Sequence, residues 1–183
     1  MSRVLVAGMG NVLRQDDGFG VEVARQLMAR DGLPAGVKVV EVGIGGIHLV
    51  QEMMDGYDAL VVIDAVERGS APGTVHLLEA EVEDLALWSD AARGDFLADM
   101  HYTTPSKAMI LAKALGVLPP LVYILGCQPG EADALGIGLT TPVEAATARA
   151  IRELDALVSR LGAEADQGEP ALVSPHSLGH DRD

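Results

Sequence analysis

Cysteine is almost absent from this sequence of 183 residues, which contains only Cys127. A single cysteine forms no intramolecular disulfide and supplies no CxxC metal site, so we expect a protein of the reducing cytoplasm. Basic residues are also few: 13 Lys and Arg stand against 27 Asp and Glu, for a formal net charge of −14. Nucleic acids and anionic membrane surfaces bind clusters of Lys and Arg, so we expect neither as a partner.

Long hydrophobic runs are missing as well. The apolar stretch of the N-terminal segment "MSRVLVAGMG" is interrupted by glycine, which makes it too short for a secretory signal and far too short to span a bilayer. Hydrophobic residues nevertheless make up 49% of the chain, enough for one sizeable core. We therefore expect no membrane segment and a single domain over residues 1–163, followed by a disordered acidic tail over 164–183.

Short runs rich in Val, Ile and Leu alternate with amphipathic segments along the chain. Continuous apolar runs such as "ALVVI" are typical of strands buried on both faces, as in a largely parallel sheet between helices. The run after "GSAPGT" follows the third strand too closely for a parallel crossover, so we expect it to be antiparallel. These patterns predict an α/β three-layer sandwich with a mixed, mostly parallel, twisted five-stranded sheet and helices on both faces. The expected strands are 3–7, 37–42, 59–64, 74–79 and 121–126, and the expected helices are 18–30, 46–55, 105–116 and 142–161.

A glycine-rich turn, "GMGNVLRQDDGFG", joins the first strand to the first helix. Such turns usually bind phosphate, but Leu13 stands where a dinucleotide fingerprint needs its third glycine, and the GK[ST] of a P-loop is absent. Asp16 is expected to cap the helix, since a carboxylate there accepts unpaired amide hydrogen bonds. Asp17 is then left to face an open crevice.

Two more residues complete a candidate site with Asp17. Asp64 ends the most apolar strand, and ligands of open α/β sheets lie beyond the carboxyl ends of strands. His101 immediately precedes a predicted helix. Two carboxylates and one imidazole with open coordination positions suit a borderline divalent metal. By contrast, His48 and His76 are expected to be packing or surface residues.

These residues also carry a family resemblance. "VLVAGMGNVLRQDDGFG" resembles the N-terminal signature of the nickel-iron hydrogenase maturation endopeptidases, and the similarity continues through "VVIDAV", "APGTV", the histidine before helix 105–116, and "LGCQPGEADALGIGLTTPVEAA". The order and spacing of these motifs over roughly residues 3–160 make the resemblance specific.

The resemblance implies the activity, the partner and the metal. Members of that family cut a C-terminal extension from the hydrogenase large-subunit precursor after nickel insertion, and the nickel is carried by the precursor. Their metal-contacting residues correspond here to Asp17, Asp64 and His101. Relatives often have glutamate at the first position, so the shorter aspartate leaves Asp16 as the alternative ligand. The resemblance therefore implies a cytoplasmic nickel-dependent or aspartic-type endopeptidase.

Several points remain open at the level of sequence. Asp17 or Asp64 is the acid-base candidate, while the metal either polarises a carbonyl or activates a water. The "GIGGIH" turn either supplies amides from Gly45 and Gly46 to a substrate strand or is simply a tight turn. The alternatives to a protease are a non-catalytic metal-binding chaperone for the precursor and, disfavoured by the broken glycine pattern, a nucleotide-binding module.

Overall fold

The fold is known from a computed structural model, which describes residues 2–98 and 104–167. The strands are β1 (Val4–Met9), β2 (Val37–Gly43), β3 (Ala59–Ala65), β4 (Val75–Glu79) and β5 (Leu121–Cys127). The helices are α1 (Phe19–Ala29), α2 (Gly46–Met53), α3 (Asp90–Ala98), α4 (Pro105–Ala114) and α5 (Thr141–Gln167), with short 3-10 helices η1 (Gln15–Gly18) and η2 (Leu85–Leu87).

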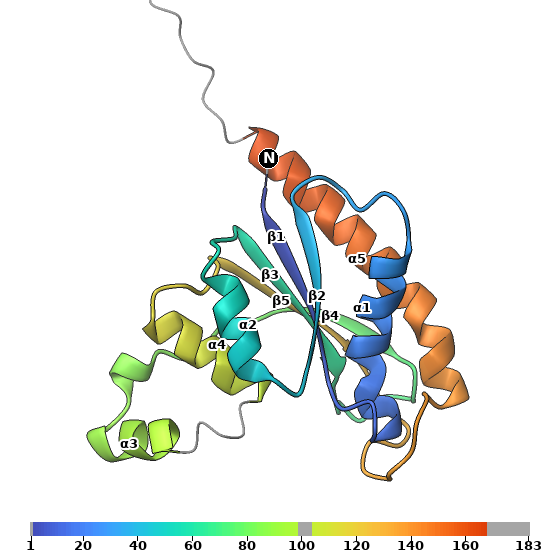
Figure 1. Cartoon of the computed structure of the whole chain (residues 1–183), viewed down its shortest axis with the longest axis horizontal. Coiled ribbons are helices and arrows are strands. Elements are labelled where there is room, and N and C mark those ends of the chain that lie inside the picture. Colours follow the sequence, from blue (N-terminus) through green and yellow to red (C-terminus); the bar gives the residue numbers. More distant parts are fainter. Residues whose placement is uncertain (1, 99–103, 168–183) are drawn as a thin grey trace, which may run out of the picture.

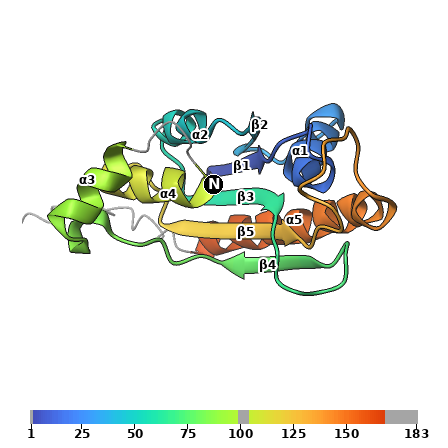
Figure 2. The same cartoon turned by 90° about the horizontal axis from the view of Figure 1, so that it is seen from below.

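The five strands form one sheet in the order β2-β1-β3-β5-β4. Four strands are parallel, and β4 pairs antiparallel with β5, so it points against its neighbours in Figure 2. This confirms the mixed, mostly parallel sheet. Because β1 lies between β2 and β3, the chain moves from β1 first to one side and then to the other. The carboxyl ends of β1 and β3 therefore flank a switch point, where ligands of open α/β sheets bind.

Helices cover both faces of this sheet, which confirms the three-layer sandwich. Figure 1 shows α1 and α5 on one side and α2 and α4 on the other. Successive residues of β1 supply the two cores in turn: Val4 and Val6 pack on the α1 and α5 side, and Leu5 and Ala7 on the opposite side. This alternation explains why the strand reads as an unbroken apolar run.

The acidic segment between β4 and α4 is more than a solvated surface. Leu85 of η2 and Phe96 of α3 are buried and belong to the core on the α2 and α4 side. Trp88 meets Phe96 edge to face, with 5.5 Å between ring centroids. The acidic residues thus lie on a segment that is fastened to the domain by three apolar side chains.

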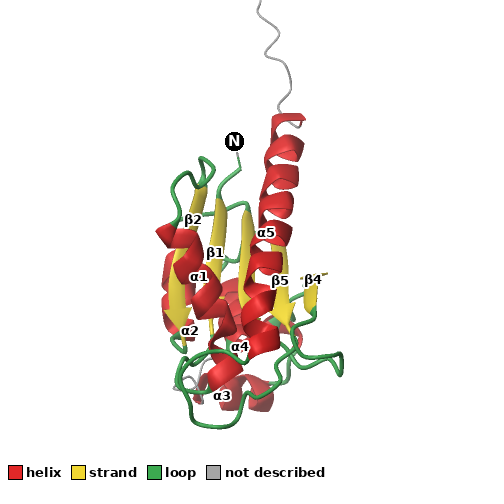
Figure 3. Ribbon diagram, turned by 90° about the vertical axis from the view of Figure 1, so that its right-hand side faces the viewer, coloured by secondary structure: helices red, strands yellow, loops and turns green. Residues whose placement is uncertain are grey.

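Helix α5 continues to Gln167, six residues beyond its predicted end at 161. Leu161 is buried, and the following "GAEADQ" is rich in alanine and glutamate, which favour helix. Residues 164–167, expected to begin the tail, are therefore helical, while 168–183 lie outside the described residues. Figure 3 shows α5 running past the amino ends of the strands. Among the described helices, none combines the length and apolar composition needed to cross a membrane.

Candidate active site

The glycines of the first turn allow backbone segments to pack closely. A Cβ on Gly20 would lie 2.0 Å from the carbonyl oxygen of Ile63, and one on Gly8 would lie 2.5 Å from the Cβ of Ala24. Helix α1 therefore begins directly against the carboxyl ends of β1 and β3. The glycine pattern thus fits close helix-to-strand packing, which requires no phosphate.

Gly10 brings the two predicted carboxylates to one place. Its φ is +119°, and a Cβ there would lie 1.7 Å from the Asp17 carbonyl oxygen and 3.6 Å from Asp64 Oδ1. Only glycine fits between the two aspartates. Both line a pocket of about 380 Å³ at the carboxyl edge of the sheet. The predicted convergence of Asp17 and Asp64 is thus seen in the geometry.

Asp17 lies in η1 and is oriented by the turn before it. The amide of Asn11 donates a hydrogen bond of 2.9 Å to Asp17 Oδ2. Within the described part of the chain, Oδ1 accepts no hydrogen bond. One carboxylate oxygen therefore fixes the side chain, and the other is available in the pocket.

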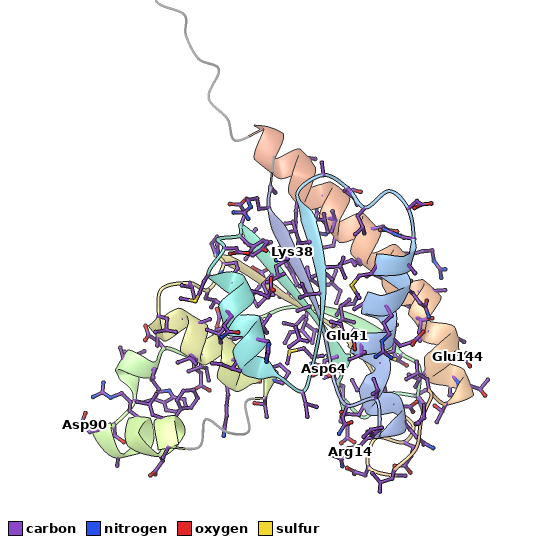
Figure 4. All side chains as sticks on the ribbon, in the orientation of Figure 1. Arg14, Lys38, Glu41, Asp64, Asp90 and Glu144 are labelled. Carbon is purple, nitrogen blue, oxygen red and sulfur yellow. The ribbon has the colours of Figure 1, made fainter. Side chains whose placement is uncertain are left out.

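Asp64 ends β3 at the same pocket, and Figure 4 shows it at the lower, carboxyl end of the strands. The Ala65 amide donates to Oδ1 at 2.9 Å, which among the described residues is the one hydrogen bond to this carboxylate. Burial raises the pKa of Asp64 from 3.8 to about 7; the Ala65 amide lowers it in part, and the negative charge of Asp17 raises it further. Two carboxylates in one pocket, with little compensating charge, would be neutralised by a cation.

Asp16 has a different role from the one expected. It caps neither η1 nor α1. The side chain is fully buried, and its Oδ2 accepts hydrogen bonds from the amides of Gly130 at 2.8 Å and Glu131 at 2.9 Å. Thr140 donates its amide to Oδ1 at 2.7 Å and its hydroxyl to Oδ2 at 2.8 Å. The helix-cap prediction for Asp16 is wrong, because a distant loop supplies the donors.

The charge of Asp16 is well accommodated there. Burial alone raises the pKa of this carboxyl, but the hydrogen bonds from Glu131, Thr140 and Gly130 outweigh burial and hold the pKa below its ordinary value. Asp16 is absent from the residues that line the pocket of Asp17 and Asp64. It is therefore engaged as an anchor for the loop between β5 and α5.

His101 lies outside the described residues, so its position is not part of this geometry. The chain re-enters the described region at Thr104, whose hydroxyl accepts from the Lys107 amide at 3.3 Å and caps α4. Thr104 and Pro105 both line the pocket of Asp17 and Asp64. Within residues 2–98 and 104–167, no group of three or more His, Cys, Asp or Glu side chains could hold a metal ion.

The glycines of the "GIGGIH" turn close the turn itself. The amide of Gly45 donates to the Val42 carbonyl and that of Gly46 to the Ile44 carbonyl, both at 3.2 Å. The neighbouring Gly43 and Ile44 line the pocket instead. The geometry favours a tight turn over Gly45 and Gly46 as donors to a substrate.

Other nucleophile and base candidates are engaged elsewhere. His48 is exposed on α2, and the His76 Nε2 lies 2.9 Å from the Ser70 hydroxyl. Cys127 is buried at the end of β5, and its pKa is raised to about 11, first by burial and then by the charge of Asp16. No described cysteine or histidine thus takes part in the pocket.

Arg14 is a pocket residue that the sequence reasoning missed. It lines the pocket beside Asp17 and forms an ion pair with Asp133 of the loop between β5 and α5. Figure 4 shows it on the loop beyond the strand ends. The sequence feature that could have indicated Arg14 as a pocket residue is its position three residues before Asp17 in the same turn.

Comparisons with known proteins show which family this chain resembles. A family model of hydrogenase maturation proteases, HycI, matches residues 21–156. The chain is 33% identical over 177 residues to the hydrogenase expression/formation protein HoxM of Azotobacter vinelandii, covering 96% of this chain and 82% of that protein. It is 34% identical over 158 residues to HupD of Rhodobacter capsulatus, covering 84% and 72%.

A solved structure shows the same similarity. The hydrogenase maturating endopeptidase HybD from E. coli superimposes with a TM-score of 0.69 at 27% identity, covering 87% of this chain and 94% of that one. The family model alone spans well over half of the chain. This chain therefore belongs to the hydrogenase maturation protease family, a group of endopeptidases.

Proposed function

We propose that this chain removes the C-terminal extension of a nickel-iron hydrogenase large-subunit precursor once nickel has been inserted, and that it binds that nickel through Asp17, Asp64 and His101. The observation that carries the proposal is the shared pocket of Asp17 and Asp64, each with a carboxylate oxygen free of hydrogen bonds from the described residues. Family membership supplies the reaction class.

The donor set suits a metal that arrives on the substrate. Two aspartates and a histidine leave coordination positions open for ligands from the precursor. Asp17, Asp64 and His101 would hold the nickel, which would supply a Lewis acid for the scissile carbonyl or for a water, and Asp17 or Asp64 would be the acid-base group. Arg14 lies at the pocket wall, where Asp133 already pairs with its charge.

Cleavage is then conditional on nickel insertion. A precursor without nickel leaves the acidic pocket of Asp17 and Asp64 without a cation, and the cost of desolvating these carboxylates opposes closure of a peptide over them. We place the reaction in the cytoplasm, as the lone buried cysteine fits a reducing compartment. The net charge of −14 favours a partner with basic segments and disfavours nucleic acid.

The experiment compares nickel-loaded and nickel-free precursor, mixed with the full-length protein and followed by intact mass spectrometry. We expect the loaded precursor alone to lose its C-terminal extension. If both forms are shortened equally, the carboxylates act without nickel, as in an aspartic-type protease. If the loaded precursor binds and keeps its full mass, the chain is a chaperone and the proposed reaction is refuted.

A further inference from the structure

A second cavity lies beside the pocket of Asp17 and Asp64, which we call the active pocket. This second cavity has no part in the chemistry proposed above. It measures about 320 Å³ and is formed between the first turn, α1, the loop before α5, and the start of α5. The segment 11–18 separates the two spaces. Every third residue of it lines the active pocket, namely Asn11, Arg14 and Asp17. The residue after each of these lines the second cavity, namely Val12, Gln15 and Gly18.

The two spaces are therefore neighbours on different faces of one short segment. Asp17 and Gly18 are adjacent in η1, and a 3-10 helix has three residues per turn, so consecutive residues point in different directions. An extended peptide rises about 3.3 Å per residue. A substrate segment with its scissile bond at Asp17 thus reaches the second cavity within a few residues.

The second cavity has apolar walls and acidic residues. Its apolar surface comes from Val12, Ile137 and Leu139. Ile137 is 87% exposed and is thus not part of the hydrophobic core of the domain. Glu22 and Glu144 also line it. In Figure 4, Glu144 stands at the lower end of α5, on the same carboxyl side of the sheet as Asp64.

The charges in this cavity are unbalanced. Its one lining cation, Arg25, is bound by both carboxylate oxygens of Glu41, at 2.9 and 2.7 Å. Glu22 accepts one hydrogen bond from the neutral side chain of Gln26 at 3.0 Å. Within the described part of the chain, Glu144 forms no ion pair. Arg25 also interacts electrostatically with Glu22, but this one cation is shared by Glu41 and Glu22, and Glu144 adds a further carboxylate, so a net negative charge is left to attract a cation.

We propose that this cavity is a specificity subsite that takes one lysine or arginine side chain of the precursor, from the segment close to the cleaved bond; this rests on the proposed function. Both side chains combine an apolar stem with a charged head, which matches the apolar walls and the two glutamates. An apolar occupant would instead cover Glu22 and Glu144 without compensation. A volume of 320 Å³ is at the small end for ligand sites, which fits one side chain.

The first test measures steady-state cleavage of nickel-loaded precursor by the full-length protein. Glu22→Gln and Glu144→Gln should each raise KM about 3-fold and together about 10-fold, the size expected for partly exposed ion pairs. Both substitutions keep the shape of the side chain. Glu153→Gln is the matched control, since it removes a carboxylate of α5 outside the cavity and should leave KM unchanged.

The apolar wall is tested in the same assay. Ile137→Ser should raise KM about 5-fold by removing exposed apolar surface from the subsite. Leu115→Ser is its control, because Leu115 is also exposed, at 56%, and follows α4 away from the active pocket. Equal KM values for these two variants would argue against a role of Ile137 in binding.

A charge reversal identifies the bound residue. Each lysine and arginine around the cleaved bond of the precursor is changed to glutamate in turn, and one change should slow cleavage by the wild-type protein and be rescued by Glu144→Lys. Unchanged KM for the Glu22 and Glu144 variants, or no rescue at any position, overturns the subsite while cleavage itself stands. A wild-type protein that leaves the loaded precursor intact overturns the proposed function instead.

Discussion

Replacing Asp64 by asparagine should abolish cleavage and yet stabilise the fold. A carboxyl whose pKa rises from 3.8 to about 7 costs about 4 kcal/mol more to ionise in the folded than in the unfolded chain. Because the pocket admits water, part of this cost is screened, and we expect Asp64→Asn to raise the free energy of unfolding at pH 8 by about 1–2 kcal/mol. The Asn oxygen still accepts from the Ala65 amide, so no hydrogen bond is lost.

The sign of the effect follows from the two protonation states. The folded-state pKa lies above the unfolded-state value, so the folded wild-type protein binds more protons than the unfolded chain between about pH 4 and pH 7. The wild-type protein therefore regains stability as the pH falls from about 7 to about 4. The advantage of Asp64→Asn should be largest at pH 8, shrink below pH 7 and vanish near pH 4.

Thermal unfolding at pH 8 and pH 5 measures this difference. For a chain of this size, 1–2 kcal/mol corresponds to about 3–6 °C in Tm. The exposed Asp31 provides the control, since Asp31→Asn removes a carboxylate without removing a buried charge. The reasoning would be refuted if Asp64→Asn were no more stable than the wild-type protein at pH 8, or if its advantage were the same at pH 5.

Three further substitutions, with one control in α5, test the geometry of the turn. Asp17→Asn should lower precursor cleavage, followed by mass spectrometry, about 10²-fold or more with an unchanged circular dichroism spectrum; full activity would exclude Asp17 as a ligand. Asp16→Asn should lower the free energy of unfolding in urea by about 2–3 kcal/mol, since an amide group would face N–H donors; wild-type stability would contradict the anchor role. Gly20→Ala should lower the free energy of unfolding by about 3 kcal/mol or more, measured by thermal unfolding, because its Cβ would lie 2.0 Å from the Ile63 carbonyl oxygen. Gly162→Ala is the control: a Cβ there meets nothing within 4 Å, so this substitution should raise the free energy of unfolding by about 0.5–1 kcal/mol.

The sheet could be predicted because its signal is local. The runs "RVLVA" and "ALVVI" contain only residues that suit strands buried on both faces, apart from the leading arginine, and they form β1 and β3. The short connection after β3 was enough to make β4 antiparallel. From these two facts the position of Asp64 at the carboxyl edge followed. Strand direction thus explains where Asp64 lies, while its role in catalysis or metal binding stays a prediction.

The role of Asp16 could not be predicted because its partners are distant in sequence. The amides that it binds lie 114 to 124 residues later, and no local pattern announces them. The rule for helix caps considers only the residues at the start of a helix. Here the Asp16 carboxylate instead accepts hydrogen bonds from the amides of Gly130, Glu131 and Thr140. Similarly, the glycines of the turn reflect contacts with β3 that appear only in three dimensions.

The two adjacent aspartates of the turn have different roles. Asp17 faces the pocket that contains Asp64, while Asp16 faces the loop that carries Ile137. Asp16 thereby holds in place the loop whose residues 137–139 line the second cavity. The amide of Gln15 adds a hydrogen bond of 3.0 Å to the Gly136 carbonyl beside Ile137. A change at Asp16 therefore acts on substrate binding through the loop, raising KM, whereas a change at Asp17 acts on the reacting groups. Comparing KM with kcat for the two asparagine variants separates an anchor from a ligand at neighbouring positions.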